Sequence, residues 1–168
     1  MTRYYLLIYT CFALLFGCDQ KDNASKPNSL WHIFSAEKVD LISRQCSRPS
    51  PGPVEDSWQP TEGDIQEILG SLRDLLKHEI EKYDAAFSAY DISVEAEASD
   101  YSFQFVGLVI EDEKVIYVNG VQTPFLGVTR SGDITELVSV CDGGSAFFGV
   151  EYVVSEKKFR NFHFNGHA

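Results

Sequence analysis

The sequence predicts an α+β domain, in which one long amphipathic helix packs on an antiparallel sheet of about five strands. Two patterns carry this prediction. Between residues 61 and 83 apolar residues recur at three- and four-residue spacing, and after Tyr90 they alternate with polar residues or form short runs between turns. The chain has 168 residues, 44% of them hydrophobic and 23% charged, which suits one packed domain.

The first part of the domain has weaker patterns. An apolar cluster at residues 30–34 is typical of a short strand or a packing segment, and Val39, Leu41 and Ile42 follow it. Prolines at positions 49, 51 and 53 then predict an extended connector.

The helix is the clearest element. Thr61 and Asp64 have the spacing of a capping box and predict where the helix begins. A stripe on one face of a helix is typical of a surface that packs on the core. Its members are Ile65, Ile68, Leu69, Leu72, Leu75, Leu76, Ile80 and Tyr83.

Short turns separate the predicted strands, which favours an antiparallel meander. The turns are expected at 111–114, 142–145 and 155–158, and a longer loop at 124–132. The strands are expected where residues 92, 94 and 96 alternate with polar ones, and at 101–110, 115–118, 137–140, 147–154 and 159–164. A helix ahead of such a meander resembles cystatin-like folds, a likeness of topology that implies no activity.

The N-terminus has the pattern of a secretory signal. Arg3 supplies a positive charge, and residues 4–17 form an apolar run that Asp19 ends. A membrane-spanning helix needs about 20 apolar residues, so this run is short for an anchor, although a short transmembrane anchor is the alternative. We expect residues 1–17 to be removed as a signal peptide.

Leu15-Phe16-Gly17-Cys18 resembles the lipobox of bacterial lipoproteins, with Phe16 where that family has a small residue. The resemblance implies that a diacylglyceryl group (palmitate among its acyl chains) is attached to Cys18, which becomes the first residue after cleavage. Asp19 resembles the signal for inner-membrane retention in enteric-type lipoproteins. Residues 18–29 are then a lipid-anchored flexible tether, and residues 30–168 the single domain.

The sequence holds four cysteines, of which Cys11 lies in the predicted signal and Cys18 in the lipobox. The remaining pair, Cys46 and Cys141, is expected to form a disulfide in an oxidising compartment. Two buried free thiols are the alternative, and a catalytic thiol is a third possibility that lacks a surrounding signature.

Residues 140–168 are also similar to the ends of small uncharacterised bacterial proteins, which imply no activity. The likeness rests on Cys141-Asp142-Gly143-Gly144, Phe148-Gly149-Val150-Glu151-Tyr152 and Phe162-His163-Phe164-Asn165-Gly166.

The formal net charge of −11 disfavours nucleic-acid binding, because an acidic surface repels phosphates, and is compatible with a basic protein partner. The sequence contains no phosphate-binding loop, dinucleotide fingerprint or HExxH motif. His163 and His167 are too few to predict a metal site. We therefore expect no cofactor, no metal and no catalytic residue.

These observations favour a non-enzymatic, membrane-anchored lipoprotein of the cell envelope, facing the periplasm or the exterior, whose domain binds another protein. One alternative is a small-ligand carrier, suggested by the aromatic content of 13%. The other is an enzyme whose site lies near Cys141, Asp142 and His163, which requires a deep pocket around them.

Overall fold

The computed structural model describes residues 31–87, 97–128 and 133–166. The predicted signal peptide, Cys18, the tether at 18–29 and the alternating residues at 92, 94 and 96 lie outside the described residues.

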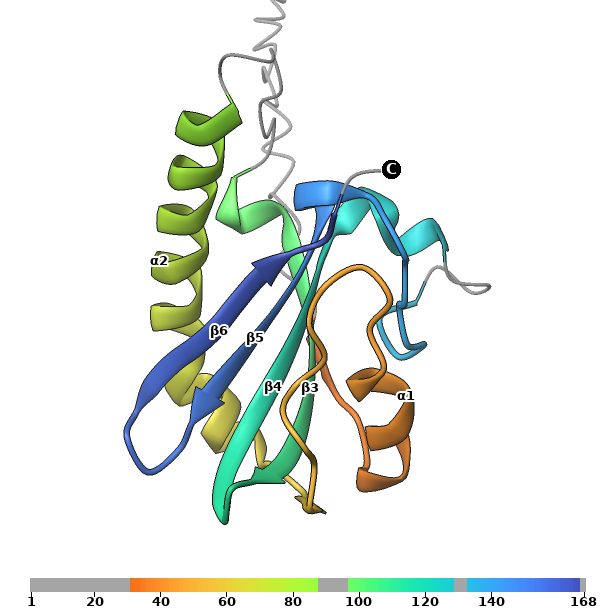
Figure 1. Ribbon diagram of the computed structural model, residues 1–168, viewed down its shortest axis with the longest axis vertical. Helices are drawn as coiled ribbons and strands as arrows, with labels where there is room; N and C mark the ends of the chain where they lie inside the picture. Colours follow the sequence, from red (N-terminus) through yellow and green to blue (C-terminus); the bar gives the residue numbers. More distant parts are fainter. Residues whose placement is uncertain (1–30, 88–96, 129–132, 167–168) are drawn as a thin grey trace, which may run out of the picture.

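The described residues confirm the α+β class, with one long helix and a six-stranded sheet (Figure 1). Helix α2 lies along one face of the sheet, and the short helix α1 lies on the other side. The helices are α1 (Val39–Ser43) and α2 (Glu62–Phe87). The strands are β1 (Trp31–Ile33), β2 (Asp56–Trp58), β3 (Tyr101–Ile110), β4 (Glu113–Gln122), β5 (Phe147–Val153) and β6 (Lys158–Phe164).

The sheet is mixed, which corrects the prediction of a wholly antiparallel sheet. Strands β3 to β6 form the predicted antiparallel meander, but β1 pairs with β3 in parallel. Strand β2 pairs antiparallel with β3, and the two short strands share one edge, β1 along residues 103–105 and β2 along residues 107–109. Three residues are too few to show an alternating pattern, which is why the sequence did not predict β2.

The turn between β3 and β4 lies within the segment predicted at 111–114 but is shorter, because β4 begins at Glu113 and extends the strand predicted at 115–118 at both ends. Glu111 and Asp112 have φ angles of 55° and 62°, the left-handed geometry that a two-residue hairpin turn requires. Strands β3 and β4 then pair along ten residues each, from Ile110 opposite Glu113 to Tyr101 opposite Gln122.

Helix α2 begins with the predicted capping box. The amide of Thr61 donates to Asp64 Oδ2 at 2.7 Å, and the amide of Asp64 donates to Thr61 Oγ1 at 3.2 Å. The apolar stripe packs on the sheet, which buries its side chains, and each fully buried Leu or Ile contributes about 1.5–3 kcal/mol. The helix contributes Ile65, Ile68, Leu69, Leu72, Leu76 and Ile80, and the sheet contributes Tyr101, Phe103, Phe105, Ile116, Val118, Phe148, Val150 and Tyr152.

The prediction of a strand at 137–140 is wrong, because this segment crosses the sheet face that is turned away from α2. The amide of Val138 donates to Gln104 Oε1 at 3.1 Å, and its carbonyl accepts from Asn119 Nδ2 at 2.9 Å. Side chains thus satisfy backbone groups that a neighbouring strand would otherwise satisfy.

Gln104 and Asn119 can do this because they are cross-strand partners on β3 and β4 and are both buried. Asn119 Nδ2 also donates to Gln104 Oε1 at 2.8 Å, and Gln104 Nε2 donates to the carbonyls of Ile134 and Glu136 at 2.9 and 2.6 Å. This amide pair fixes the irregular segment on the sheet.

Candidate functional site

A groove runs between α2 and β6, the last strand at one edge of the sheet. One pocket, of about 520 Å³, lies at the end of α2 and is lined by Glu79, Lys82, Tyr83, Phe87, Phe162, His163, Phe164, Asn165 and Gly166. A second, of about 290 Å³, is lined by Leu75, Glu79, Lys82, Phe159, Arg160, Asn161 and Phe162. Because the pockets share Glu79, Lys82 and Phe162, we treat them as one feature, the α2–β6 groove.

Aromatic contacts build the floor of this groove. The ring centroids of Tyr83 and Phe164 lie 5.1 Å apart in an edge-on arrangement, and those of Tyr83 and Phe87 lie 4.5 Å apart. Phe162 stacks on the buried ring of Phe148 at 5.0 Å. Because rings from α2 and from β6 pack against other rings, they give the groove a fixed apolar surface, which is the kind of surface that binds apolar side chains of a ligand.

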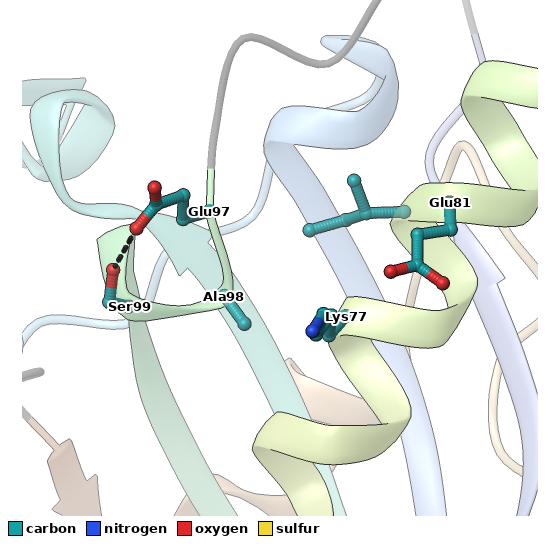
Figure 2. Close-up of a pocket in the computed structure, with 6 residues that line it drawn as sticks. Lys77, Glu81, Glu97, Ala98 and Ser99 are labelled. Carbon is teal, nitrogen blue, oxygen red and sulfur yellow. Dashed lines mark hydrogen bonds between the residues drawn. The ribbon is translucent and has the colours of Figure 1, made fainter.

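A further pocket, of about 420 Å³, lies between α2 and residues 97–99 (Figure 2). Lys77 and Glu81 border it from the helix, and the Ser99 hydroxyl donates to Glu97 Oε2 at 3.3 Å across from them. Its described lining includes no histidine or cysteine, and the Ser99–Glu97 hydrogen bond lies within the short 3-10 turn that leads into β3.

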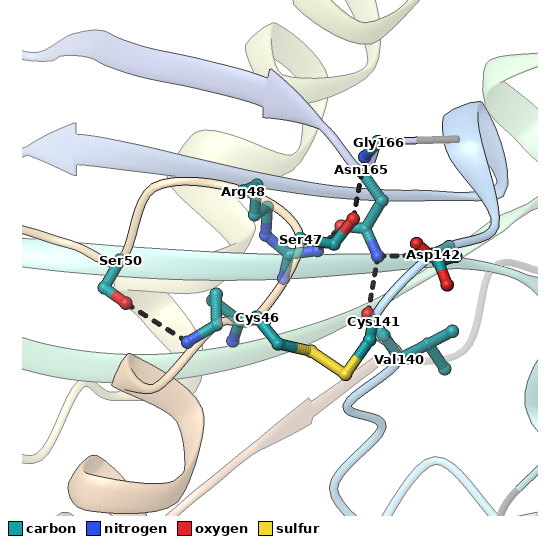
Figure 3. The surroundings of a disulfide bond; sticks show 10 residues. Cys46, Ser47, Arg48, Ser50, Val140, Cys141, Asp142, Asn165 and Gly166 are labelled. Atoms are coloured by element: carbon teal, nitrogen blue, oxygen red, sulfur yellow. Dashed lines mark hydrogen bonds between the residues drawn. A yellow bond between two sulfur atoms is a disulfide. The ribbon is translucent and has the colours of Figure 1, made fainter. Parts of the chain in front are cut away.

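The disulfide predicted between Cys46 and Cys141 is present, with 5.0 Å between the two Cα atoms (Figure 3). It joins the loop after α1 to the segment before β5. Beside it the amide of Gly166 donates to the carbonyl of Ser47 at 3.1 Å, which ties the end of β6 to the same loop.

A buried arginine that sequence reasoning missed connects the loop after α1 with β4 and with the end of β6 beside the disulfide. Arg48 is 8% exposed; its Nε donates to the Tyr117 hydroxyl at 3.2 Å, and its two terminal nitrogens donate to Asn165 Oδ1 and Asn119 Oδ1. Asn165 Nδ2 in turn donates to the carbonyls of Val140 and Asp142 at 2.8 and 2.9 Å.

Burial raises the pKa of Tyr117, and the nearby Arg48 charge opposes that shift. Because each polar group in the network has a hydrogen-bond partner, its arrangement is that of a structural element. A signal for the network did exist: Gln104 places a polar side chain within the strand predicted at 101–110, and Asn119 directly follows the strand predicted at 115–118.

The structure does not assemble the enzyme site that was considered around Cys141, Asp142 and His163. The sulfur of Cys141 is bonded to Cys46 and offers no thiolate. His163 lies on β6 opposite Gly149 and lines the α2–β6 groove, whereas no pocket described above includes Cys141 or Asp142.

His167 lies outside the described residues, and His32 packs edge-on against Phe34 at 4.8 Å. Within the described ranges, no group of three or more His, Cys, Asp or Glu side chains is placed to hold a metal ion. Nor do those ranges contain a helix long and apolar enough to cross a membrane.

Comparisons with known proteins add no family to this description, because no family model, no curated protein and no solved structure matches the chain.

Proposed function

We propose that this protein is an exported lipoprotein, cut before Cys18 and anchored by lipid on that thiol, whose domain binds another protein without catalysing a reaction. The observation that carries the proposal is Leu15-Phe16-Gly17-Cys18 at the end of an apolar run. The Cys46–Cys141 disulfide supports it, since disulfides persist in oxidising compartments outside the cytoplasm.

The α2–β6 groove supports a binding role over an enzymatic one. It offers aromatic side chains and an edge strand, whereas Cys141, the thiol considered for an enzyme, is bonded to Cys46. Between α2 and the sheet, where the small-ligand alternative would place its cargo, large aromatic side chains such as Phe103 and Phe148 are fully buried and in contact.

Three finer expectations belong to the same proposal. The net charge of −11 supports a partner that is basic overall, and it supports no nucleic-acid partner. Asp19 supports retention in the inner membrane, with the domain facing the periplasm. A helix followed by the β3–β6 meander supports the likeness to cystatin-like folds, although β1 and β2 add to that order.

The experiment is intact-mass analysis and detergent phase partitioning of the full-length chain expressed in a bacterium. We expect the wild-type protein to begin at a lipidated Cys18 and to enter the detergent phase. The Cys18→Ser variant should keep residues 1–17 and lose the lipid mass.

Cys11→Ser is the matched control, because Cys11 would be discarded with the signal and its loss should change nothing. Wild-type protein that carried no lipid mass, or a Cys18→Ser variant with unchanged mass and partitioning, would reject the proposal.

A further inference from the structure

We propose that β6 and the α2–β6 groove bind an extended segment of a partner protein by β-strand addition, a statement that rests on the protein-binding function proposed above. The partner segment would alternate apolar residues, which enter the groove, with acidic residues, which face the opposite side of the sheet.

The edges of the sheet differ in how they are covered. The outer edge of β3 is occupied by β1 and β2, whereas β6 has β5 as its neighbour on one side and no further strand among the described residues. In Figure 1 β6 borders α2 as the last strand. An edge strand offers backbone donors and acceptors to an incoming chain.

The backbone hydrogen bonds show which groups of β6 face that edge. The amide of Asn165 donates to the carbonyl of Phe147 at 3.0 Å, and Phe148 faces Phe164 in the ladder. Because backbone groups of successive strand residues point to opposite sides, the N–H and C=O of Phe164 point away from β5.

A bulge limits where the added strand pairs. Asn161 has a φ angle of 55°, and the β5–β6 register shifts beside it. An added strand therefore cannot keep one register along the whole of β6: it pairs around Phe162 to Phe164 and, beyond the bulge at Asn161, in a shifted register beside Lys158. A ladder interrupted in this way binds weakly by itself, which makes the groove the main source of affinity.

The groove lies on the face where alternate side chains of an added strand would point. Phe159, Phe162 and Phe164 reach the helix side of the sheet, where they pack against the core beneath α2. Tyr83 and Phe87 continue this surface on the helix. Every second side chain of the incoming segment would meet these rings, so apolar residues fit there.

The other face of β6 is cationic. The seven residues of β6 include Lys158, Arg160 and His163 and no acid. Arg160 already binds Glu151 at 2.8 Å, so the preference for carboxylates rests on the exposed Lys158. A second copy of this chain would bring Lys158 and its neighbours against the same cations, which disfavours β6–β6 pairing.

The test measures peptide binding to the full-length protein as it is isolated, in nanodiscs if it carries lipid and in buffer if it does not, with the same medium without protein as the blank. The probe is a fluorescent nonapeptide in which Glu alternates with Phe and Val, read by anisotropy. One comparison peptide has Lys in place of Glu, and another has N-methyl groups on alternate amides, which prevents it from pairing as a strand.

We expect the Glu peptide to bind, the N-methyl peptide to bind at least tenfold more weakly, and the Lys peptide about fivefold more weakly. Lys158→Glu should reverse the preference between the Glu and Lys peptides, and Phe87→Ala should weaken both. Lys38→Glu, which changes an exposed lysine at the N-cap of α1, is the matched control and should change nothing.

Equal binding of the N-methylated and unmodified peptides, or no binding of any peptide, would overturn the proposal. So would sedimentation of the wild-type protein as a dimer that Phe87→Ala disrupts, since a second copy would then occupy the α2–β6 groove. Lipid attachment is measured separately on Cys18. If the peptides do not bind, the lipoprotein proposal is unaffected, and if Cys18 carries no lipid, the proposal of strand addition at β6 is unaffected.

Discussion

The guanidinium of Arg48 donates to the hydroxyl of Tyr117 at 3.2 Å, although these buried residues are 69 positions apart in sequence. The contact joins the loop after α1 to the middle of β4 and closes the polar network on the sheet face away from α2. Stability in this corner therefore depends on a hydrogen-bonded charge as well as on apolar packing.

Replacing Arg48 by alanine should destabilise the protein by about 3 kcal/mol, because Asn119, Asn165 and Tyr117 would lose a buried partner. Urea unfolding of the variant and the wild type measures the difference. Arg44→Ala is the control, since Arg44 is exposed at the end of α1, and its effect should stay within about 0.5 kcal/mol. If Arg48→Ala lowered the free energy of unfolding no more than Arg44→Ala, the polar network would contribute little to stability.

Gly149→Ala should destabilise the protein by about 2 kcal/mol. A Cβ atom at Gly149 would lie 2.4 Å from the Tyr117 hydroxyl and 2.6 Å from Arg48 Nε, so one of these groups must move. Gly70→Ala is the opposite case: a Cβ on this exposed helical glycine meets nothing within 4 Å, and the variant should gain about 0.5–1 kcal/mol. Equal effects of the two substitutions in thermal unfolding would contradict the packing argument.

Reduction of the Cys46–Cys141 disulfide should lower the free energy of unfolding by about 4 kcal/mol, because a link across 95 residues restricts the unfolded chain. Denaturant unfolding with and without dithiothreitol measures this loss. The Cys46→Ser, Cys141→Ser double variant should match the reduced wild type and should not respond to dithiothreitol. A double variant as stable as the oxidised protein would refute the prediction.

The elements that the sequence predicted well are those with long regular patterns. Helix α2 and β3 each span many residues, and turn chemistry marks the hairpin that follows β3, although β4 covers Glu113–Gln122 where the sequence predicted only 115–118. The segment at 137–140 has the composition of a strand, yet the amides of Gln104 and Asn119 bind its backbone instead. Only the tertiary structure brings these amides to Val138, so local propensity could not foresee the outcome.

The candidate groove escaped sequence reasoning for a related reason. The sequence predicted the aromatic residues of β6 as strand residues and Tyr83 as part of the helix stripe. The contact between Tyr83 and Phe164 that builds the groove joins two elements far apart in the sequence, so neither pattern indicated it. The disulfide was predictable, since counting left one pair of cysteines. Arg48 gave no signal, because a lone arginine in a loop is usually exposed.

Stability should fall as the pH rises above about 10, with Tyr101 as a main cause. Burial raises the pKa of Tyr101 to about 12, and its hydroxyl donates to the carbonyl of Ser145 at 2.7 Å. The unfolded chain releases this proton near pH 10 while the folded chain retains it until about pH 12, so this group's stabilisation, about 2–3 kcal/mol, is present below pH 10 and is lost between these values.

Urea unfolding at pH 9, 10 and 11 measures the slope, and Tyr101→Phe should reduce it. The slope should not vanish in that variant, because burial also raises the pKa of Tyr117. If wild type and Tyr101→Phe lost stability equally over this range, Tyr101 would not be the cause.

The capping box at the start of α2 predicts that the stability of the protein falls at low pH. The hydrogen bonds from Thr61 to the Asp64 carboxylate lower its pKa, so the stabilisation is present above the unfolded pKa near 4 and is lost as the pH falls through the lower folded value. Asp64→Ala should therefore cost about 1 kcal/mol at pH 7 and less at pH 2.5. Asp74→Ala, at an exposed position in the middle of α2, is the control and should show a smaller cost at pH 7. A cost for Asp64→Ala that was the same at both pH values would show that the carboxylate charge does not stabilise the start of α2.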